Sequence, residues 1–163
     1  MRSTLAVALG GAVGLTVARP SLLRRQVASF PAGQSWDIIL NKENVDLNNL
    51  AATETAESSV IDIDLFDNDD TTISALKEQG KQVICYFSAG SREDWRDDSS
   101  RFTASDYGQG LDGWKGENWV NVKSTNVRNI MKDRIALAAK KGCAAVDPDN
   151  VDGFVSSHTV THG

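Results

Sequence analysis

The sequence predicts an α/β fold built on a parallel sheet, and three observations support this class. Short apolar runs rich in β-branched residues alternate with segments of helical period, in the order strand, helix, strand. The run 83–87 is apolar without interruption, as expected for a strand covered on both faces. With 163 residues the chain is shorter than the roughly 200 residues of a complete eight-stranded α/β barrel. We therefore expect one domain with a parallel sheet or part of a barrel.

The first half of the chain contains three expected strands and one helix. Residues 36–40, with the sequence WDIIL, form the first strand, and residues 60–65 form a second strand that ends in acids. Asp69 or Asp70 then caps a helix that carries Ile73 and Leu76 and ends at Gly80. Residues 83–87 form the third strand.

A long polar segment, residues 88–121, follows the third strand. It is too long for an ordinary connection, so we expect it to carry function or short helices. Ser124 or Asn126 caps the next helix, which ends at Gly142. The apolar positions with helical period in that helix are Val127, Ile130, Met131, Ile135 and Ala138. Residues 143–146 form the fourth strand, and DPDN follows it.

The first 18 residues have the form of a secretory signal peptide. Arg2 precedes an apolar stretch at 5–17, and small residues end at Ala18. The stretch is shorter than the roughly 20 apolar residues that a membrane span requires. Residues 19–34 are expected to be a pro-segment or linker, in which Arg24 and Arg25 are either a cleavage site or solvated arginines. We expect a secreted, extracellular protein with no membrane partner in its mature form.

Charge and cysteine content exclude several functional classes. The chain carries a net charge of −5 at pH 7, and its first 25 residues contain four arginines and no acid, so the remainder is more acidic still. Such a chain repels phosphate backbones, which argues against nucleic-acid binding, and attracts a cationic partner. Cys85 and Cys143 are too far apart in sequence for a CxxC metal or redox pair. We expect them on neighbouring strands, either as a disulfide or as buried thiols.

Carboxylates gather where the second and fourth strands end. These acids are Asp62, Asp64, Asp67, Asp147, Asp149 and Asp152. In parallel α/β folds the carboxyl ends of the strands meet, and ligands bind there. Helix capping explains a single acid at each end, whereas a group of like charges indicates a site for a ligand, a metal or a proton.

Calcium is the main alternative ligand for these acids, and the sequence argues against it. An EF-hand loop needs Gly at its sixth position and Glu at its twelfth, whereas counting from Asp147 gives Asp152 and His158. The chain has no GxGxxG, GxxxxGK[ST], GxSxG or HExxH motif. His158 and His162 lie in a polar tail without helical pattern, so we expect neither a metal nor a cofactor.

Five segments resemble, in order, a known enzyme family. They are VIDIDLFDN, VICYFSAGSREDWRDD, GWKGENWVN, NVRNIMKDRIALAAKKGC and VDPDNVDGF. From about residue 36 to residue 154 the chain resembles the endo-α-1,4-polygalactosaminidases, glycoside hydrolase family 114. The resemblance implies a (β/α)8 TIM barrel, truncated here to about its first four strands over residues 35–154. It also implies hydrolysis of α-1,4-linked galactosamine polymers, which are cationic polysaccharides.

The resemblance further implies two catalytic carboxylates, as glycoside hydrolysis requires. It places one of them, the nucleophile or stabiliser, at Asp149. The expected substrate-binding residues are Asp64, Tyr86, Asp147, Asp152 and Trp36. In the family, a glutamate on a later barrel strand acts as acid and base, and the atypical tail 155–163 does not resemble the family's continuation.

The long polar segment contains further candidates whose roles stay open. Trp95, Trp114 and Trp119 are expected either to stack on sugar rings or to anchor the segment. Glu93 and Glu117 are expected to be solvated loop acids. Two hypotheses follow. The chain is either an incomplete polygalactosaminidase, inactive by itself, or a secreted non-catalytic protein that binds carbohydrate or another partner.

Overall fold

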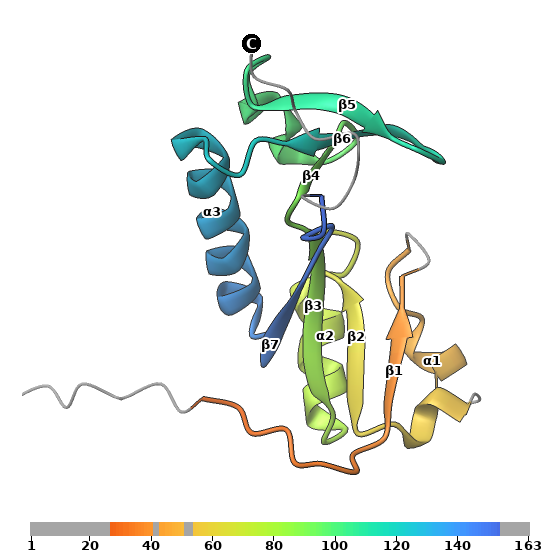
Figure 1. Cartoon of the computed structure of the whole chain (residues 1–163). Coiled ribbons are helices and arrows are strands. Elements are labelled where there is room, and N and C mark those ends of the chain that lie inside the picture. Colours follow the sequence, from red (N-terminus) through yellow and green to blue (C-terminus); the bar gives the residue numbers. More distant parts are fainter. Residues whose placement is uncertain (1–26, 41–42, 51–53, 154–163) are drawn as a thin grey trace, which may run out of the picture.

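A four-stranded parallel sheet forms the centre of the computed structural model, which describes residues 27–40, 43–50 and 54–153 (Figure 1). The strand order is β1-β2-β3-β7. The strands are β1 Trp36–Ile39, β2 Val60–Asp64, β3 Gln82–Ser88 and β7 Ala145–Asp149. Neighbouring strands are parallel throughout, which confirms the predicted α/β class. The expected signal peptide and the tail 155–163 lie outside the described residues.

The helices begin and end at the capping residues that the sequence indicates. Helix α2 (Asp70–Glu78) starts after Asp69, whose side chain accepts a hydrogen bond from the Thr72 amide at 2.7 Å. Helix α3 (Thr125–Lys141) starts after Ser124 and ends at Gly142, where φ is 90°. Two single turns, α1 (Leu47–Leu50) and η1 (Glu54–Glu57), lie between β1 and β2. No helix among the described residues is long and apolar enough to cross a membrane.

The core lies between one face of the sheet and helices α2 and α3. Its largest cluster combines apolar residues of β2 and β3 with Ile73 and Leu76 of α2 and Ala138 of α3. One expectation for α3 is wrong: Ile135 is 48% exposed, whereas Arg134 is buried. Arg134 is tolerated inside because its guanidinium donates to both oxygens of Asp98 at 2.8 Å and to the Ser88 carbonyl at 2.7 Å.

A disulfide joins Cys85 of β3 to Cys143, with their Cα atoms 6.0 Å apart. Cys143 lies two residues before β7 rather than inside it. The bond therefore ties the central strand to the connection between α3 and β7. Of the two alternatives left open by the sequence, the structure has the disulfide, and the free-thiol interpretation is wrong.

The long polar segment folds as a second, antiparallel sheet with the order β4-β6-β5. Its strands are β4 (Ser91–Glu93), β5 (Tyr107–Leu111) and β6 (Trp114–Val120), and the turn η2 (Asp97–Arg101) connects β4 to β5. Short helices were expected here, and η2 is the only one among the described residues of the segment. Figure 1 shows the small sheet lying across the carboxyl end of the parallel strands. The small sheet therefore covers the end of the parallel sheet where a ligand is expected to bind.

Candidate functional site

A pocket of about 140 Å³ lies where the parallel strands end beneath the small sheet. Three of the predicted site residues, Asp64, Tyr86 and Asp149, line it together. The other charged residues of its wall are Asp67, Glu93, Arg96 and Glu117, and its tryptophans are Trp95 and Trp114. Acidic and aromatic side chains around one cavity are suited to a polar ring-shaped ligand.

Asp149 is the last residue of β7, and both its main chain and its side chain are held. Its carbonyl oxygen accepts from the amides of Ala89 and Gly90, at 2.8 and 3.1 Å. The Tyr86 hydroxyl donates to the Asp149 carboxylate at 2.6 Å. Burial, followed by this hydrogen bond, raises the pKa of Tyr86 above its usual range. Tyr86 thus remains a neutral donor that orients the carboxylate.

The residue after Asp149 fixes the direction in which the chain leaves the strand. Asn150 has φ of 58°, in the left-handed region that asparagine tolerates. Its side-chain amide donates to Ser91 Oγ at 2.7 Å and to Glu117 Oε1 at 2.9 Å. A Cβ at Gly90 would lie 1.7 Å from the Asn150 carbonyl oxygen, so this close approach requires glycine.

Arg96 donates hydrogen bonds to three carboxylates at one wall of the pocket. Its Nε and Nη2 donate to the two oxygens of Glu93, at 3.0 and 3.1 Å. Its Nη groups also donate to Asp64, at 3.2 and 2.5 Å, and to Asp67 at 2.9 Å. Burial alone would lower the pKa of Arg96, but the hydrogen bonds and charges of these acids raise it above its usual range. The guanidinium stays charged and holds the three carboxylates in place.

Glu93 and Glu117 are buried, so the expectation that they are solvated is wrong. They lie directly opposite each other on β4 and β6, where like charges are unfavourable unless they are compensated. Arg96 compensates Glu93, and Glu117 Oε1 accepts from Ser88, Ser91 and Asn150. Burial raises the pKa of Glu93 above its usual value, and Arg96 opposes that rise.

Asp147 lies deeper than Asp149 and interacts with Asp62 of β2 instead of lining the pocket. Residues of alternate strands share a layer inside α/β barrels, which explains how Asp62 and Asp147 meet across β3. Burial, then the charge and hydrogen bonding of Asp147, raise the pKa of Asp62 to about 7. Oδ1 of Asp62 is buried with no hydrogen-bond partner among the described residues. Asp62 therefore keeps its proton to near neutral pH.

This pair makes stability depend on pH in a defined direction. The unfolded chain releases the Asp62 proton near pH 4 and the folded chain near pH 7. The free energy of unfolding therefore falls as the pH rises from about 4 to about 7. Asp62→Asn should remove this fall, which we expect to be roughly 2–4 kcal/mol because each unit by which the pKa is raised corresponds to about 1.4 kcal/mol. Urea unfolding at several pH values measures it, with the exposed Glu78→Gln as control. Parallel pH profiles for wild type and Asp62→Asn would contradict the raised pKa of Asp62.

Two other predicted substrate contacts lie outside the pocket. Asp152 lines a neighbouring cavity. Trp36 pairs with Val60 where both strands begin, and is therefore at the opposite end of the sheet from Asp149. Its side chain is 66% exposed. Leu40, which directly follows β1, lines the pocket.

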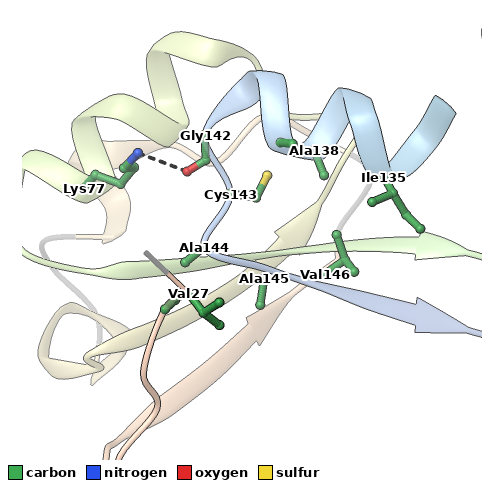
Figure 2. A pocket seen from close by; sticks show the side chains of 11 residues that line it. Val27, Lys77, Ile135, Ala138, Gly142, Cys143, Ala144, Ala145 and Val146 are labelled. Atoms are coloured by element: carbon green, nitrogen blue, oxygen red, sulfur yellow. Dashed lines mark hydrogen bonds between the residues drawn. The ribbon is translucent and has the colours of Figure 1, made fainter. Parts of the chain in front are cut away.

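A larger cavity, about 510 Å³, lies elsewhere and does not suit the same chemistry (Figure 2). Its wall is formed by the last turns of α3, the start of β7 and Val27, and Lys77 donates to the Gly142 carbonyl at 3.0 Å. No carboxylate is among its described lining residues. In the described part of the chain, no group of three His, Cys, Asp or Glu side chains is arranged to hold a metal ion.

Arg96, Glu93, Glu117 and Asn150 were not assigned to the site from the sequence. Arg96 could have been found from charge balance, because the acids at the end of β2 need a cation once they are buried. Asp112-Gly113 is a strong hairpin signal, and it predicts the pairing of β5 with β6 that carries Glu117 to the pocket. No local sequence signal predicts the hydrogen bond that Asn150 donates to Glu117.

Comparison with known proteins identifies similar structures. Residues 18–162 match the sequence profile of glycoside-hydrolase family GH114. The crystal structure of Aspergillus fumigatus Ega3 in complex with galactosamine is similar, with a TM-score of 0.72 and 45% identity over 80% of this chain and 49% of that one. The glycoside hydrolase domain of Pseudomonas aeruginosa PelA has a TM-score of 0.61 at 19% identity, over 74% of this chain and 46% of that domain, which shows likeness of fold alone. A search of curated proteins gave no match.

The match to these structures agrees with the truncated barrel expected from the sequence. The chain spans about half the length of the solved structures that it resembles. Its four parallel strands and their helices correspond to part of a TIM-barrel architecture.

Proposed function

Because the chain belongs to glycoside-hydrolase family GH114, we propose that it binds α-1,4-linked galactosamine polymers in the pocket around Asp149. The observation that carries the proposal is the Asp149 carboxylate, held by Tyr86 among acids and tryptophans at the carboxyl ends of the strands. Ega3, with 45% identity, has been solved with galactosamine. An amine-bearing sugar suits the pocket, since five acids line it and Arg96 is the only basic residue among its described lining residues.

Asp149 is the residue suited to act on the sugar. Glycoside cleavage passes through a state with positive charge on the anomeric carbon, and an ionised carboxylate beneath that carbon stabilises it or bonds to it. Tyr86 donates to Asp149 and so limits its rotation. Trp95 and Trp114 offer apolar faces on which a sugar ring can stack.

We propose that this chain alone binds the polymer without cleaving it. Cleavage needs a second carboxyl group that gives a proton to the leaving oxygen. Both oxygens of Glu93 accept hydrogen bonds from Arg96, and Oε1 of Glu117 accepts three. Asp64 is paired with Arg96 as well. The resemblance assigns the proton donor to a glutamate on a later barrel strand, and in this proposal none of these acids replaces it.

Hydrolysis by this chain is the second candidate function, and one observation favours it. Burial raises the pKa of Glu93, which is the property of a proton-donating carboxyl group. In that case Glu93 and Asp149 would form the catalytic pair. The two candidates differ in whether new reducing ends appear.

The test combines a binding titration with a reducing-end assay on α-1,4-galactosamine oligomers. We expect the chain to bind, and Asp149→Asn to weaken binding roughly tenfold or more, because hydrogen bonds to charged groups contribute about 1.5–3 kcal/mol. Glu78→Gln, an exposed acid on α2, should bind as wild type does. No reducing ends should appear. Reducing ends that are lost in Glu93→Gln would establish hydrolysis, and equal binding of a neutral glucan would contradict the proposed substrate.

We also propose that the protein is secreted. The Cys85–Cys143 disulfide supports this, since such bonds persist in oxidising compartments. The signal-like form of residues 1–18 supports it as well. Mass spectrometry of culture medium should find a mature chain that begins after Ala18, and retention of the protein inside cells would contradict it.

A further inference from the structure

The two outer strands of the parallel sheet, β1 and β7, lie at opposite sides of it (Figure 1). Among the described residues, no strand pairs with the outer edge of either one. The backbone groups at such an edge pair readily with a further strand, and exposed edges therefore lead chains to associate. Each copy of the chain offers two edges of this kind.

Trp36 and Ile38 place apolar surface beside the edge of β1. They are two residues apart on one strand, so their side chains lie on the same face of the sheet. Val60 and Ile84 lie in the same two rows of paired residues and share that face. Ile61, the neighbour of Val60, packs in the core with residues of α2, so the helices cover the opposite face. Trp36 and Ile38 remain 66% and 44% exposed, and neither lines the proposed sugar pocket.

A second apolar surface flanks the edge of β7. It is the cavity of about 510 Å³ that has no carboxylate among its described lining residues. Figure 2 shows Ile135 of α3 and Val146 of β7 at the wall of this cavity. Ile135 is 48% exposed, and Val27, which also lines the cavity, is 88% exposed. Exposed apolar surface beside an unpaired strand edge is typical of a protein–protein interface.

A second copy of this chain fits both edges at once. An α/β barrel closes with eight parallel strands, and one copy supplies four. A two-fold axis along the strands keeps all eight parallel and places β7 of each copy beside β1 of the other. The two edge strands are of similar length, with four residues in β1 and five in β7. A single strand added by an unrelated protein would cover one edge and leave the other open.

We propose that two copies of this chain associate edge to edge, β7 of each against β1 of the other, and close an eight-stranded parallel barrel. Trp36 and Ile38 of both copies are then buried in its interior, where bulky apolar side chains form the layers of such a barrel. The inference does not depend on the sugar. It assigns Trp36, which lies at the opposite end of the sheet from the sugar pocket, to an interface, where tryptophan often contributes much of the binding energy.

Sedimentation equilibrium of the full chain of 163 residues measures the association. We expect twice the mass of one chain at micromolar concentrations and no larger species, because the closed pair uses both edges of each copy. Ile38→Lys and Trp36→Lys should each raise the dissociation constant about tenfold or more, since each would bury an uncompensated charge. Val122→Lys adds the same charge between β6 and α3, at a position 62% exposed, and should leave the dissociation constant unchanged.

Hydrogen exchange at the two edges tests the same pairing without a substitution. Deuterium uptake by residues 36–39 and 145–149 of the wild type should fall as its concentration rises through the range in which it dimerises. A dimer whose uptake at these residues does not change would overturn the proposal, and so would a dimer that Ile38→Lys and Val122→Lys leave equally intact.

Two further outcomes would also overturn it. A species that grows steadily with concentration would show that the edges pair without closing. A monomer at every concentration would exclude the second copy, and slow exchange at the edges of that monomer would assign their cover to residues 1–26 or 154–163. Circular dichroism and an intact disulfide verify that each variant is folded.

Discussion

Arg96→Met is expected to lower the free energy of unfolding by about 3–5 kcal/mol, because removing one partner of a buried ion cluster leaves the other charges uncompensated. Arg96 is the cation shared by Asp64, Asp67 and Glu93, and its side chain is only 6% exposed. Denaturant unfolding at pH 7 measures the loss. Binding of galactosamine should weaken as well, since the wall of the pocket loses its anchor.

A matched substitution distinguishes this cluster from an ordinary surface pair. Arg101 makes an ion pair with Asp133, but both side chains are well exposed, at 45% and 61%. Arg101→Met should therefore cost less than about 1 kcal/mol. Equal losses for Arg96→Met and Arg101→Met would contradict a buried cluster at the pocket.

Replacing both cysteines by alanine is expected to lower the free energy of unfolding by about 4 kcal/mol. The disulfide closes a loop with a sequence separation of 58 residues, and loops of this length restrict the unfolded chain strongly. The comparison is urea unfolding of the oxidised wild type and the Cys85→Ala/Cys143→Ala variant. Wild type treated with a reductant should shift toward the variant. Coincident unfolding curves would show that the bond restrains little.

The parallel sheet could be predicted because its elements follow local rules. Strand β3 is a continuous apolar run, and Ser124 and Gly142 bound α3 as capping residues. Each of these signals lies within a few neighbouring residues. The three site residues Asp64, Tyr86 and Asp149 followed from the rule that strand ends converge, together with the family resemblance.

The remaining parts depend on contacts between distant segments. Arg134 occupies a core position of α3 because Asp98, 36 residues away, pairs with it. Asp62 meets Asp147 because residues of alternate strands share a layer, which no pattern in either strand shows. Glu93 and Glu117 looked solvated because their compensating partners come from other elements. Trp36 looked like a sugar contact, and only the strand direction places it at the amino end.

Galactosamine is expected to bind at the carboxyl ends of the parallel strands, and three of the tryptophans provide the most direct test. In a ¹⁵N-labelled chain, the indole N–H signals of Trp95 and Trp114 report on the pocket around Asp149. The signal of Trp36 reports on the opposite end of the sheet. Titration with galactosamine should shift the signals of Trp95 and Trp114 and leave that of Trp36 unchanged. A shift at Trp36 alone, or no shift at saturating sugar, would contradict the account.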